Sequence, residues 1–204
     1  PVGRLAWRLR AAGQRVLVVV DPSKPWAAAV AAGVINPVTG RWAVKSWQID
    51  ALLPEAEHSY RTIEAELGIQ IYHPIPLRRF CQNEADLKRI GRRSRNPRYA
   101  GVLGKLSPAG EGPEALQDPC GSFEIHGAAY VDLPPLLAAM RADLEAAHCY
   151  RKEYFDHHAL QQGAGGLWQY KNVTAQQVVF CEGAAVTQNP FFPDLAMKPV
   201  KGET

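Results

Sequence analysis

The apolar positions in the first 21 residues predict a helix, a tight turn and a buried strand. Four of them recur at spacings of three and four: Leu5, Ala6, Leu9 and Ala12. This spacing places them on one helical face, and Gly13 follows where a helix C-terminus favours a residue that tolerates positive φ. Residues 16–20 are all aliphatic, a run too short for a helix and typical of a parallel strand covered on both faces.

Further along, the pattern predicts two longer helices and several short strands. Residues 49–67 carry apolar side chains at a helical period, and Gly68 is the expected C-terminal stop. Residues 69–77 alternate in polarity but contain two prolines, which place a strand at a sheet edge or break it into short pieces. Residues 122–131 alternate again, as a strand pair or one bent strand, and residues 133–147 predict a helix.

Other stretches carry weaker patterns. Residues 83–90 predict a short helix, and the arginine-rich residues that follow it have a Gly/Ser/Asn/Pro setting that favours a solvated loop. Residues 104–121 are rich in glycine and proline and are expected to form a loop. Residues 178–181 predict a second short buried strand that ends at Glu-Gly.

Composition narrows the class of protein. The 204 residues are 47% hydrophobic, which is ample for a buried core. A net charge of +3 is too weak by itself to indicate a nucleic-acid or membrane partner, and no apolar run reaches the roughly 18 to 20 residues that cross a bilayer. The four cysteines include no CxxC pair and are interpreted as reduced thiols of a cytoplasmic protein. Both ends of the chain are interpreted as cut, because it begins on proline and stops close to a strand-like segment.

Asp21 carries the first candidate chemistry, because it directly follows the predicted strand at 16–20. A carboxylate at such a strand end in a βαβ unit accepts hydrogen bonds from the ribose of a dinucleotide. The glycine motif that should precede the helix is reduced to Val2-Gly3, with no second or third glycine before Leu5. Two alternatives follow: the sequence is incomplete at this point, or the protein binds no dinucleotide.

Three further stretches have two interpretations each. Residues 27–33 are so small that their backbone is expected to lie close to another group, with a packing helix of alanines as the alternative. The basic stretch from Lys88 to Arg98 is interpreted as solvated, with an RNA or phosphate contact as the alternative. Residues 148–158 include three histidines, but without an i, i+4 pair, so no metal site is predicted.

Five segments, taken in order, carry a family resemblance. They are LAWRLRAAGQRVLVVVD, AAGVINPVTGR, IHGAAYVDLPPLLAAMRADL, VVFCEGA and KPVKGE. Together they resemble the flavin-dependent amine and amino-acid oxidoreductases of the D-amino-acid oxidase and glycine oxidase type. Each segment is weak alone, but their order and spacing make the resemblance specific, and it runs through nearly the whole chain.

The resemblance implies an α/β fold in which a Rossmann-like FAD-binding domain is interleaved with an α+β substrate domain bearing an antiparallel sheet. Residues 1–48 would form the first part of the FAD-binding domain, residues 49–131 part of the substrate domain, and residues 132–204 the second part of the FAD-binding domain. The C-terminal remainder of the family fold is absent. The resemblance further implies that the glycine turn exists, so we expect an interruption of the chain between Gly3 and Leu5.

The resemblance also implies a set of FAD-binding residues. They are Gly3, Asp21, Pro22, Ala27, Ala28, Ala32, Gly33, Val34, Phe155, Cys181, Glu182 and Gly183. In the family pattern Asp21 is the ribose ligand, and residues 27–28 are the small positions near the pyrophosphate. Residues 32–34 supply the backbone against the pyrophosphate and flavin, and residues 181–183 form a second strand-end contact. The main chain of Phe155 meets the adenine, with Tyr154 as the alternative position. No catalytic residue is assigned.

The implied activity is oxidation of the C–N bond of an amino acid or amine, with hydride transfer to the flavin. The expected partner is therefore a small amine or amino acid, with no membrane and no nucleic acid. Four side chains are candidates for substrate contact, each with a structural role as the simpler reading: Tyr72, His73, Arg79 and His126. Two alternatives stay open, namely a non-catalytic relative that acts as a binding protein and, more weakly, a tRNA-modifying flavoprotein.

Overall fold

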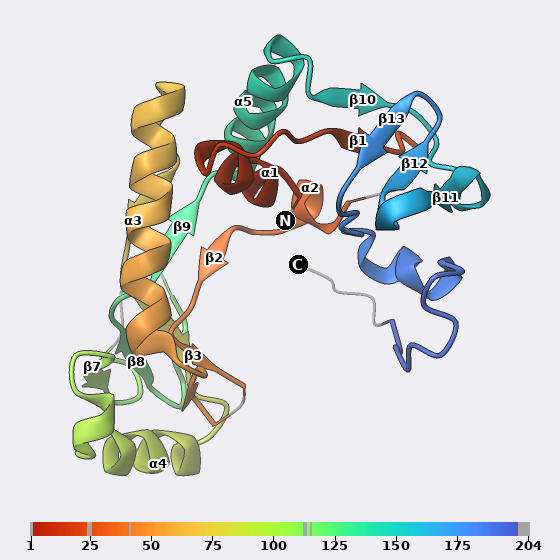
Figure 1. Cartoon of the computed structure of the whole chain (residues 1–204). Helices are drawn as coiled ribbons and strands as arrows, with labels where there is room; N and C mark the ends of the chain where they lie inside the picture. The colour runs from red at the N-terminus through yellow and green to blue at the C-terminus, as the bar shows by residue number, and fades with distance from the viewer. Residues whose placement is uncertain (1, 24–25, 41, 112–113, 115, 200–204) are drawn as a thin grey trace. The chain divides into compact units, whose positions relative to one another are not determined.

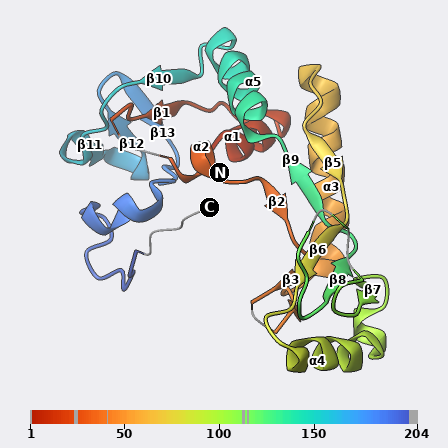
Figure 2. The same cartoon turned by 180° about the vertical axis from the view of Figure 1, so that it is seen from behind.

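The computed structural model describes residues 2–23, 26–40, 42–111, 114 and 116–199 (Figures 1 and 2). The chain divides into two compact units, one made of Pro1–Ala31 with Leu137–Thr204 and the other of Ala32–Leu136. The fold is mixed α/β, and within the described residues four of its five small sheets are antiparallel. The domain boundaries expected at residues 48 and 131 stay predictions.

The first unit is built on a parallel strand pair. Its elements there are α1 (Val2–Ala11), β1 (Val18–Val20), β10 (Tyr150–Lys152) and most of α5 (Leu133–Ala146), which spans the division at residue 136. β1 runs parallel to β10 with Val18 opposite Tyr150, which confirms the predicted parallel strand, although only three of the five aliphatic residues pair. Ala6, Val18 and Leu144 form the core between the helices and this pair. Gly13 ends α1 at φ +75°, as predicted.

The remainder of the first unit consists of short elements. They are α2 (Ala27–Val30), β11 (Leu160–Gln162), β12 (Trp168–Tyr170), β13 (Val173–Ala175) and 3₁₀ turns at His157–Ala159, Ala164–Gly166 and Gly183–Gln188. The three strands form an antiparallel sheet in the order of the sequence. The buried strand predicted at 178–181 is wrong, because this segment belongs to no sheet and Val179 is 59% exposed. Its apolar residues contribute instead to aromatic packing, in which the Phe180 ring stacks on Phe191 with centroids 5.6 Å apart.

The second unit contains two antiparallel three-stranded sheets, a hairpin and two helices. The elements are β2 (Val34–Ile35), β3 (Val38–Thr39), β4 (Val44–Lys45), α3 (Ile49–Leu67), β5 (Tyr72–Pro74), β6 (Leu77–Phe80), α4 (Glu84–Ser94), a 3₁₀ turn η1 (Pro97–Tyr99), β7 (Leu103–Ser107), β8 (Ser122–Ile125) and β9 (Ala129–Val131). The sheet orders are β2-β9-β5 and β6-β8-β7, and β3 pairs with β4. α4 lies against β7 and β8, where Ile90, Phe123 and Ile125 form the core (Figure 1).

Several predictions for the second unit are confirmed and two are wrong. α3 has the predicted bounds and ends at Gly68 with φ +64°, and the two prolines divide residues 69–80 into β5 and β6. The predicted basic loop is wrong, because α4 continues to Ser94 and η1 follows it. The loop predicted at 104–121 is wrong at its start, where β7 pairs with β8. Within the described residues, no helix is both long enough and apolar enough to cross a membrane.

Candidate functional site

The carboxyl ends of β1 and β10 lie at the same edge of their sheet, because the two strands are parallel. Asp21 directly follows β1 and Phe155 lies three residues beyond β10. The backbone N–H of Glu153 donates to the Val20 carbonyl at 3.1 Å, which extends the pairing beyond β10. Open α/β sheets bind ligands outside the carboxyl ends of their strands. Asp21 and Phe155, two residues singled out from the sequence, therefore both follow strand ends at the same edge of this sheet.

Asp21 is held by a local turn. Its Oδ1 accepts hydrogen bonds from the Ser23 backbone N–H at 2.9 Å and from the Ser23 hydroxyl at 2.7 Å. Such a turn fixes the direction of the carboxylate. Pro22 beside it is exposed and has no N–H to compete for the carboxylate.

Phe155 belongs to a cluster of aromatic side chains. Its ring stacks on Tyr170 with centroids 4.3 Å apart and meets His157 and Phe180 edge to face at 5.4 and 6.2 Å. The neighbouring Tyr154 is 65% exposed and makes no comparable ring contact in the described residues. The ring of Phe155 is thus fixed in packing, which leaves its backbone as the part that a ligand at the strand edge would meet.

Glu182 is engaged in a polar cluster with His157 and Asn189. Its Oε1 lies 2.7 Å from His157 Nε2, and its Oε2 accepts from Asn189 Nδ2 at 2.7 Å. Both carboxylate oxygens therefore hold the 3₁₀ turn at 183–188 against the aromatic cluster. Cys181 is exposed, and a Cβ at Gly183, where φ is +57°, would meet nothing within 4 Å. The strand on which their predicted role depended is absent, and that role stays a prediction.

Gly3 lies inside helix α1, which is continuous from Val2 to Ala11. The predicted interruption between Gly3 and Leu5 is therefore wrong. A Cβ at Gly3 would lie 3.1 Å from Met140 Sδ on α5, so glycine permits the close approach of the two helices. We expected a turn here because Val2-Gly3 resembles the start of a glycine motif, whereas Gly3 is a helical packing position in the structure.

The small residues 27–34 are divided between the two units. Ala27 and Ala28 lie in α2, next to Trp26, whose ring is 5.2 Å from the Arg141 guanidinium. In the second unit, Ala32 is exposed and Val34 begins β2 with 51% exposure. Gly33 has φ +70°, and a Cβ there would lie 2.0 Å from the Val131 carbonyl oxygen.

The expectation that this backbone lies close to another group is confirmed at Gly33, where the neighbour is strand β9. The Val131 N–H donates to the Gly33 carbonyl at 2.9 Å. Contact of residues 32–34 with a pyrophosphate or flavin stays a prediction.

The four candidates for substrate contact have protein partners in the second unit. The ring of Tyr72 is buried and stacks on Tyr60 at 5.8 Å, and His73 stacks on Tyr130 at 6.1 Å. Arg79 donates to the Gly40 carbonyl at 2.8 Å. The His126 Nε2 atom lies 3.3 Å from Glu124 Oε2. These contacts are those of structural residues.

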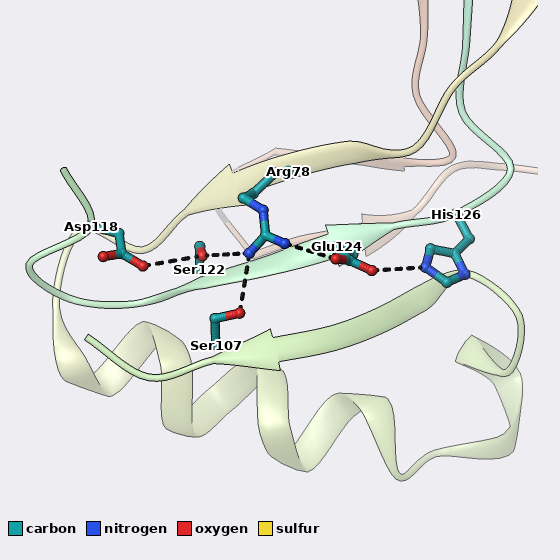
Figure 3. A network of polar contacts seen from close by, with 6 residues as sticks. All are labelled: Arg78, Ser107, Asp118, Ser122, Glu124 and His126. Carbon is teal, nitrogen blue, oxygen red and sulfur yellow. Dashed lines mark hydrogen bonds and ion pairs between the residues drawn. The ribbon is translucent and has the colours of Figure 1, made fainter. Parts of the chain in front are cut away.

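A row of polar side chains, with Arg78 at its centre and His126 at one end, crosses the β6-β8-β7 sheet (Figure 3). One guanidinium nitrogen donates to the hydroxyls of Ser107 and Ser122, each at 3.1 Å, and the other donates to Glu124 at 2.7 Å. The Ser122 hydroxyl reaches Asp118 at 3.5 Å. Because each group has a partner, the row joins three strands and fixes the loop before β8. Sequence reasoning missed it, although serine, glutamate and histidine at alternate positions 122, 124 and 126 indicate one polar sheet face.

No group of three or more His, Cys, Asp or Glu residues in the described ranges is arranged to hold a metal ion. Among the histidines at 148–158, His148 has φ +55°, and His157 pairs with Glu182.

The comparisons with known proteins agree with one another. The sequence profile of the DAO family, described as FAD dependent oxidoreductase, matches residues 5–204. The fold is similar to that of iminodiacetate oxidase from Chelativorans sp. BNC1, with 23% identity and a TM-score of 0.64. It is also similar to glycine oxidase from Geobacillus kaustophilus, with 21% identity and a TM-score of 0.67. Each comparison covers 92% of this chain and 54% of the other, so the chain spans about half the length of these oxidases.

Proposed function

The chain belongs to the DAO family of FAD-dependent oxidoreductases, and we propose that the protein oxidises the C–N bond of a small amine or amino acid. Hydride would leave the carbon next to the nitrogen and pass to FAD, which supplies the redox chemistry when bound. The two solved structures of similar fold are an iminodiacetate oxidase and a glycine oxidase, both named for small amino acids. The same proposal includes the family's Rossmann-like FAD-binding domain interleaved with a substrate domain, of which the described residues show a mixed α/β fold with one parallel strand pair.

The single observation that carries this proposal is the shared edge of β1 and β10. Asp21 follows β1, and the backbone around Phe155 follows β10. A carboxylate at this edge suits the hydroxyls of the FAD ribose, and a neighbouring backbone suits the polar edge of adenine. Gly3 fits the third glycine of the phosphate motif, whose role is close packing of the first helix, because its Cβ position is 3.1 Å from Met140.

We also propose that the other residues implied by the family resemblance lie at the FAD site. They are Pro22, Ala27, Ala28, Ala32, Gly33, Val34, Cys181, Glu182 and Gly183. Glu182 would act by positioning, since both of its oxygens are bonded to His157 and Asn189. The chain's own contribution at Asp21 would be to orient the ribose through a carboxylate that Ser23 already holds in place.

The proposal is tested by adding FAD to the purified protein, removing the excess and recording the visible spectrum. Retained oxidised flavin absorbs at about 370 and 450 nm. We expect retention, followed by anaerobic bleaching when an amine or amino acid such as glycine is added. A protein that retains no flavin would overturn the proposal in favour of a non-catalytic relative.

A matched pair of variants tests the site itself. Asp21→Ala should weaken FAD binding by about ten- to a hundredfold, the cost of losing a charged hydrogen-bond acceptor. Asp194→Ala is the control, because this exposed aspartate lies outside the proposed site. Fluorescence quenching of FAD on binding measures both. An equal effect of the two variants, or none from Asp21→Ala, would contradict the assignment of Asp21.

A further inference from the structure

A cavity of about 490 Å³ in the second unit is lined by five cationic side chains. They are Lys45, Arg89, Arg92, Arg93 and Arg98. The other lining residues in the described ranges are uncharged. The cations come from three different elements, since β4 supplies Lys45, α4 supplies three arginines and η1 supplies Arg98.

Direct contacts join the walls of this cavity. Lys45 Nζ donates to the Arg98 carbonyl at 2.9 Å, which ties β4 to η1. The Arg93 guanidinium donates to the Trp42 carbonyl and lies 5.4 Å from the centroid of Tyr99. Lys45 and Arg93 are therefore held in place before any ligand arrives, which lowers the ordering cost of binding for these two groups.

The charges of the cavity are only partly compensated. Arg89 pairs with Asp86 at 2.9 Å, and Lys45 pairs with Asp50 at 2.6 Å. These two carboxylates offset two of the five positive charges, so a net of three positive charges remains. Within the described ranges, no protein group accepts a hydrogen bond from the exposed guanidinium groups of Arg92 and Arg98. The C-terminus of α4 adds only about half a negative charge.

Stabilisation of the α4 C-terminus accounts for only part of this arrangement. Arginines in the last turn of a helix interact favourably with its dipole, which explains Arg92 and Arg93. It does not explain why Lys45 and Arg98 converge on the same cavity from two other elements. Converging like charges repel each other, and an anion bound among them would offset this repulsion.

The size and chemistry of the cavity identify the class of ligand. The volume falls in the range of small-molecule sites, roughly 300 to 1,000 Å³. Guanidinium groups bind phosphate oxygens in a bidentate manner. Single-stranded RNA would require free aromatic faces along a groove, but here Arg89 lies 3.8 Å from the centroid of Trp42 and Arg93 lies over Tyr99. We propose that this cavity binds a small polyphosphate anion, such as pyrophosphate or the phosphate chain of a nucleotide.

The proposal goes beyond the oxidoreductase activity and is tested by calorimetric titration of the purified chain with inorganic pyrophosphate. The variant Arg92→Ala/Arg98→Ala should bind pyrophosphate at least about tenfold more weakly, because two charged donors are lost. Arg95→Ala is the matched control, since this exposed arginine is close in sequence but does not line the cavity. The affinity of the Arg95→Ala variant for pyrophosphate should stay within about twofold of the wild-type affinity. The conservative variant Arg92→Lys/Arg98→Lys should recover part of the affinity.

Several results would overturn the proposal. These are no heat of pyrophosphate binding, an unchanged affinity in the double alanine variant, or an equal loss in Arg95→Ala. Pyrophosphate binding that is unchanged in the double alanine variant and is displaced by FAD would assign the anion to the flavin site instead. A labelled single-stranded RNA is the third probe, and binding of RNA without pyrophosphate would replace the small-ligand site by a nucleic-acid surface. Thermal unfolding checks that each variant is folded.

Discussion

Gly33 is the residue with the tightest surroundings among the described glycines, because its missing Cβ would lie 2.0 Å from the Val131 carbonyl oxygen. It also has φ +70°, a conformation that L side chains adopt only with strain. Gly40 has almost the same backbone conformation, φ +67°, but nothing lies within 4 Å of its Cβ position. The two positions therefore separate the cost of a left-handed backbone from the cost of a steric clash.

Replacing each glycine by alanine should show this difference in denaturant unfolding. Gly40→Ala should lower the free energy of unfolding by about 1 kcal/mol, the cost of alanine in the left-handed region. Gly33→Ala should lower it by more than about 3 kcal/mol, because strand β9 must also move away. Equal effects of the two substitutions would show that β9 can move away from residue 33 without lowering the free energy of unfolding.

The cysteines differ in access, and this predicts their order of reaction. Cys181 is exposed, whereas Cys81 is buried, and burial raises the pKa of its thiol above the usual value. Because the thiolate is the reactive form, Cys81 should react slowest with a thiol reagent at pH 7.5. A time course read by mass spectrometry should place the first label on Cys181, and Cys181→Ser should remove the fast phase. Fast labelling of Cys81 in the folded protein would contradict its burial.

The junction of α3 with β5 depends on one carboxylate near the end of the helix. Glu64 Oε1 accepts from the backbone N–H groups of Ile71 and Tyr72, each at 2.7 Å, and its Oε2 pairs with Arg61 at 2.8 Å. Burial acts to raise the pKa of Glu64, but the hydrogen bonds from Tyr72, Ile71 and Arg61 together lower it below its ordinary value. The ionised carboxylate thus joins the helix to the strand.

Glu64→Gln should lower the free energy of unfolding by about 1–2 kcal/mol at pH 7, because a neutral acceptor replaces a charged one. A folded-state pKa below the ordinary 4.5 stabilises the fold above that pH and loses the contribution as the pH falls through the folded-state pKa. The gap between wild type and variant in thermal unfolding should therefore shrink toward pH 3. Glu57→Gln is the control, because Glu57 is exposed on the same helix, and its stability should equal that of the wild type at both pH values. A difference between wild type and Glu64→Gln that does not change with pH would contradict the role of the Glu64 charge.

Sequence patterns located elements with strong periodicity and missed those decided by tertiary contacts. The bounds of α3 were predicted because its apolar period and Gly68 mark both face and end. The strand expected at 178–181 failed because a short apolar run fits a sheet or an aromatic cluster equally well, and Phe180 packs with Phe155. Arg89, Arg92 and Arg93 stand at helical spacing, but their charge favoured a loop.

For the candidate site, sequence identified residues but not their neighbours. Asp21 was predictable because a strand end followed by an acid is a local pattern. Its proximity to the chain after β10 depends on a parallel pairing between segments about 130 residues apart, which local periodicity does not contain.

At the scale of the whole molecule, the two units differ in how the chain builds them. The second unit is one continuous segment, Ala32–Leu136, whereas the first requires both Pro1–Ala31 and Leu137–Thr204. β10 pairs with β1 alone within the described residues, and α5 packs on α1 at Gly3 and Met140. The first unit therefore has no complete core without its N-terminal part.

Deleting residues 1–31 should unfold the first unit and spare the second. In hydrogen exchange, the amides of Phe123 and Ile125 should keep their protection, because their sheet and core lie wholly within the second unit. Those of Leu144 and Tyr150 should lose it. Loss of protection throughout the chain would show instead that the second unit cannot fold without the first.

During synthesis, β1 cannot pair until the ribosome has made β10. At about 5–20 residues per second, a ribosome needs roughly 7 to 26 s to make the 132 residues that separate Val18 from Tyr150. During that interval the aliphatic strand β1 has been made without its partner strand, while the second unit between them can already fold. The segment around β1 is therefore a part of the newly made chain that a chaperone would protect until β10 has been made.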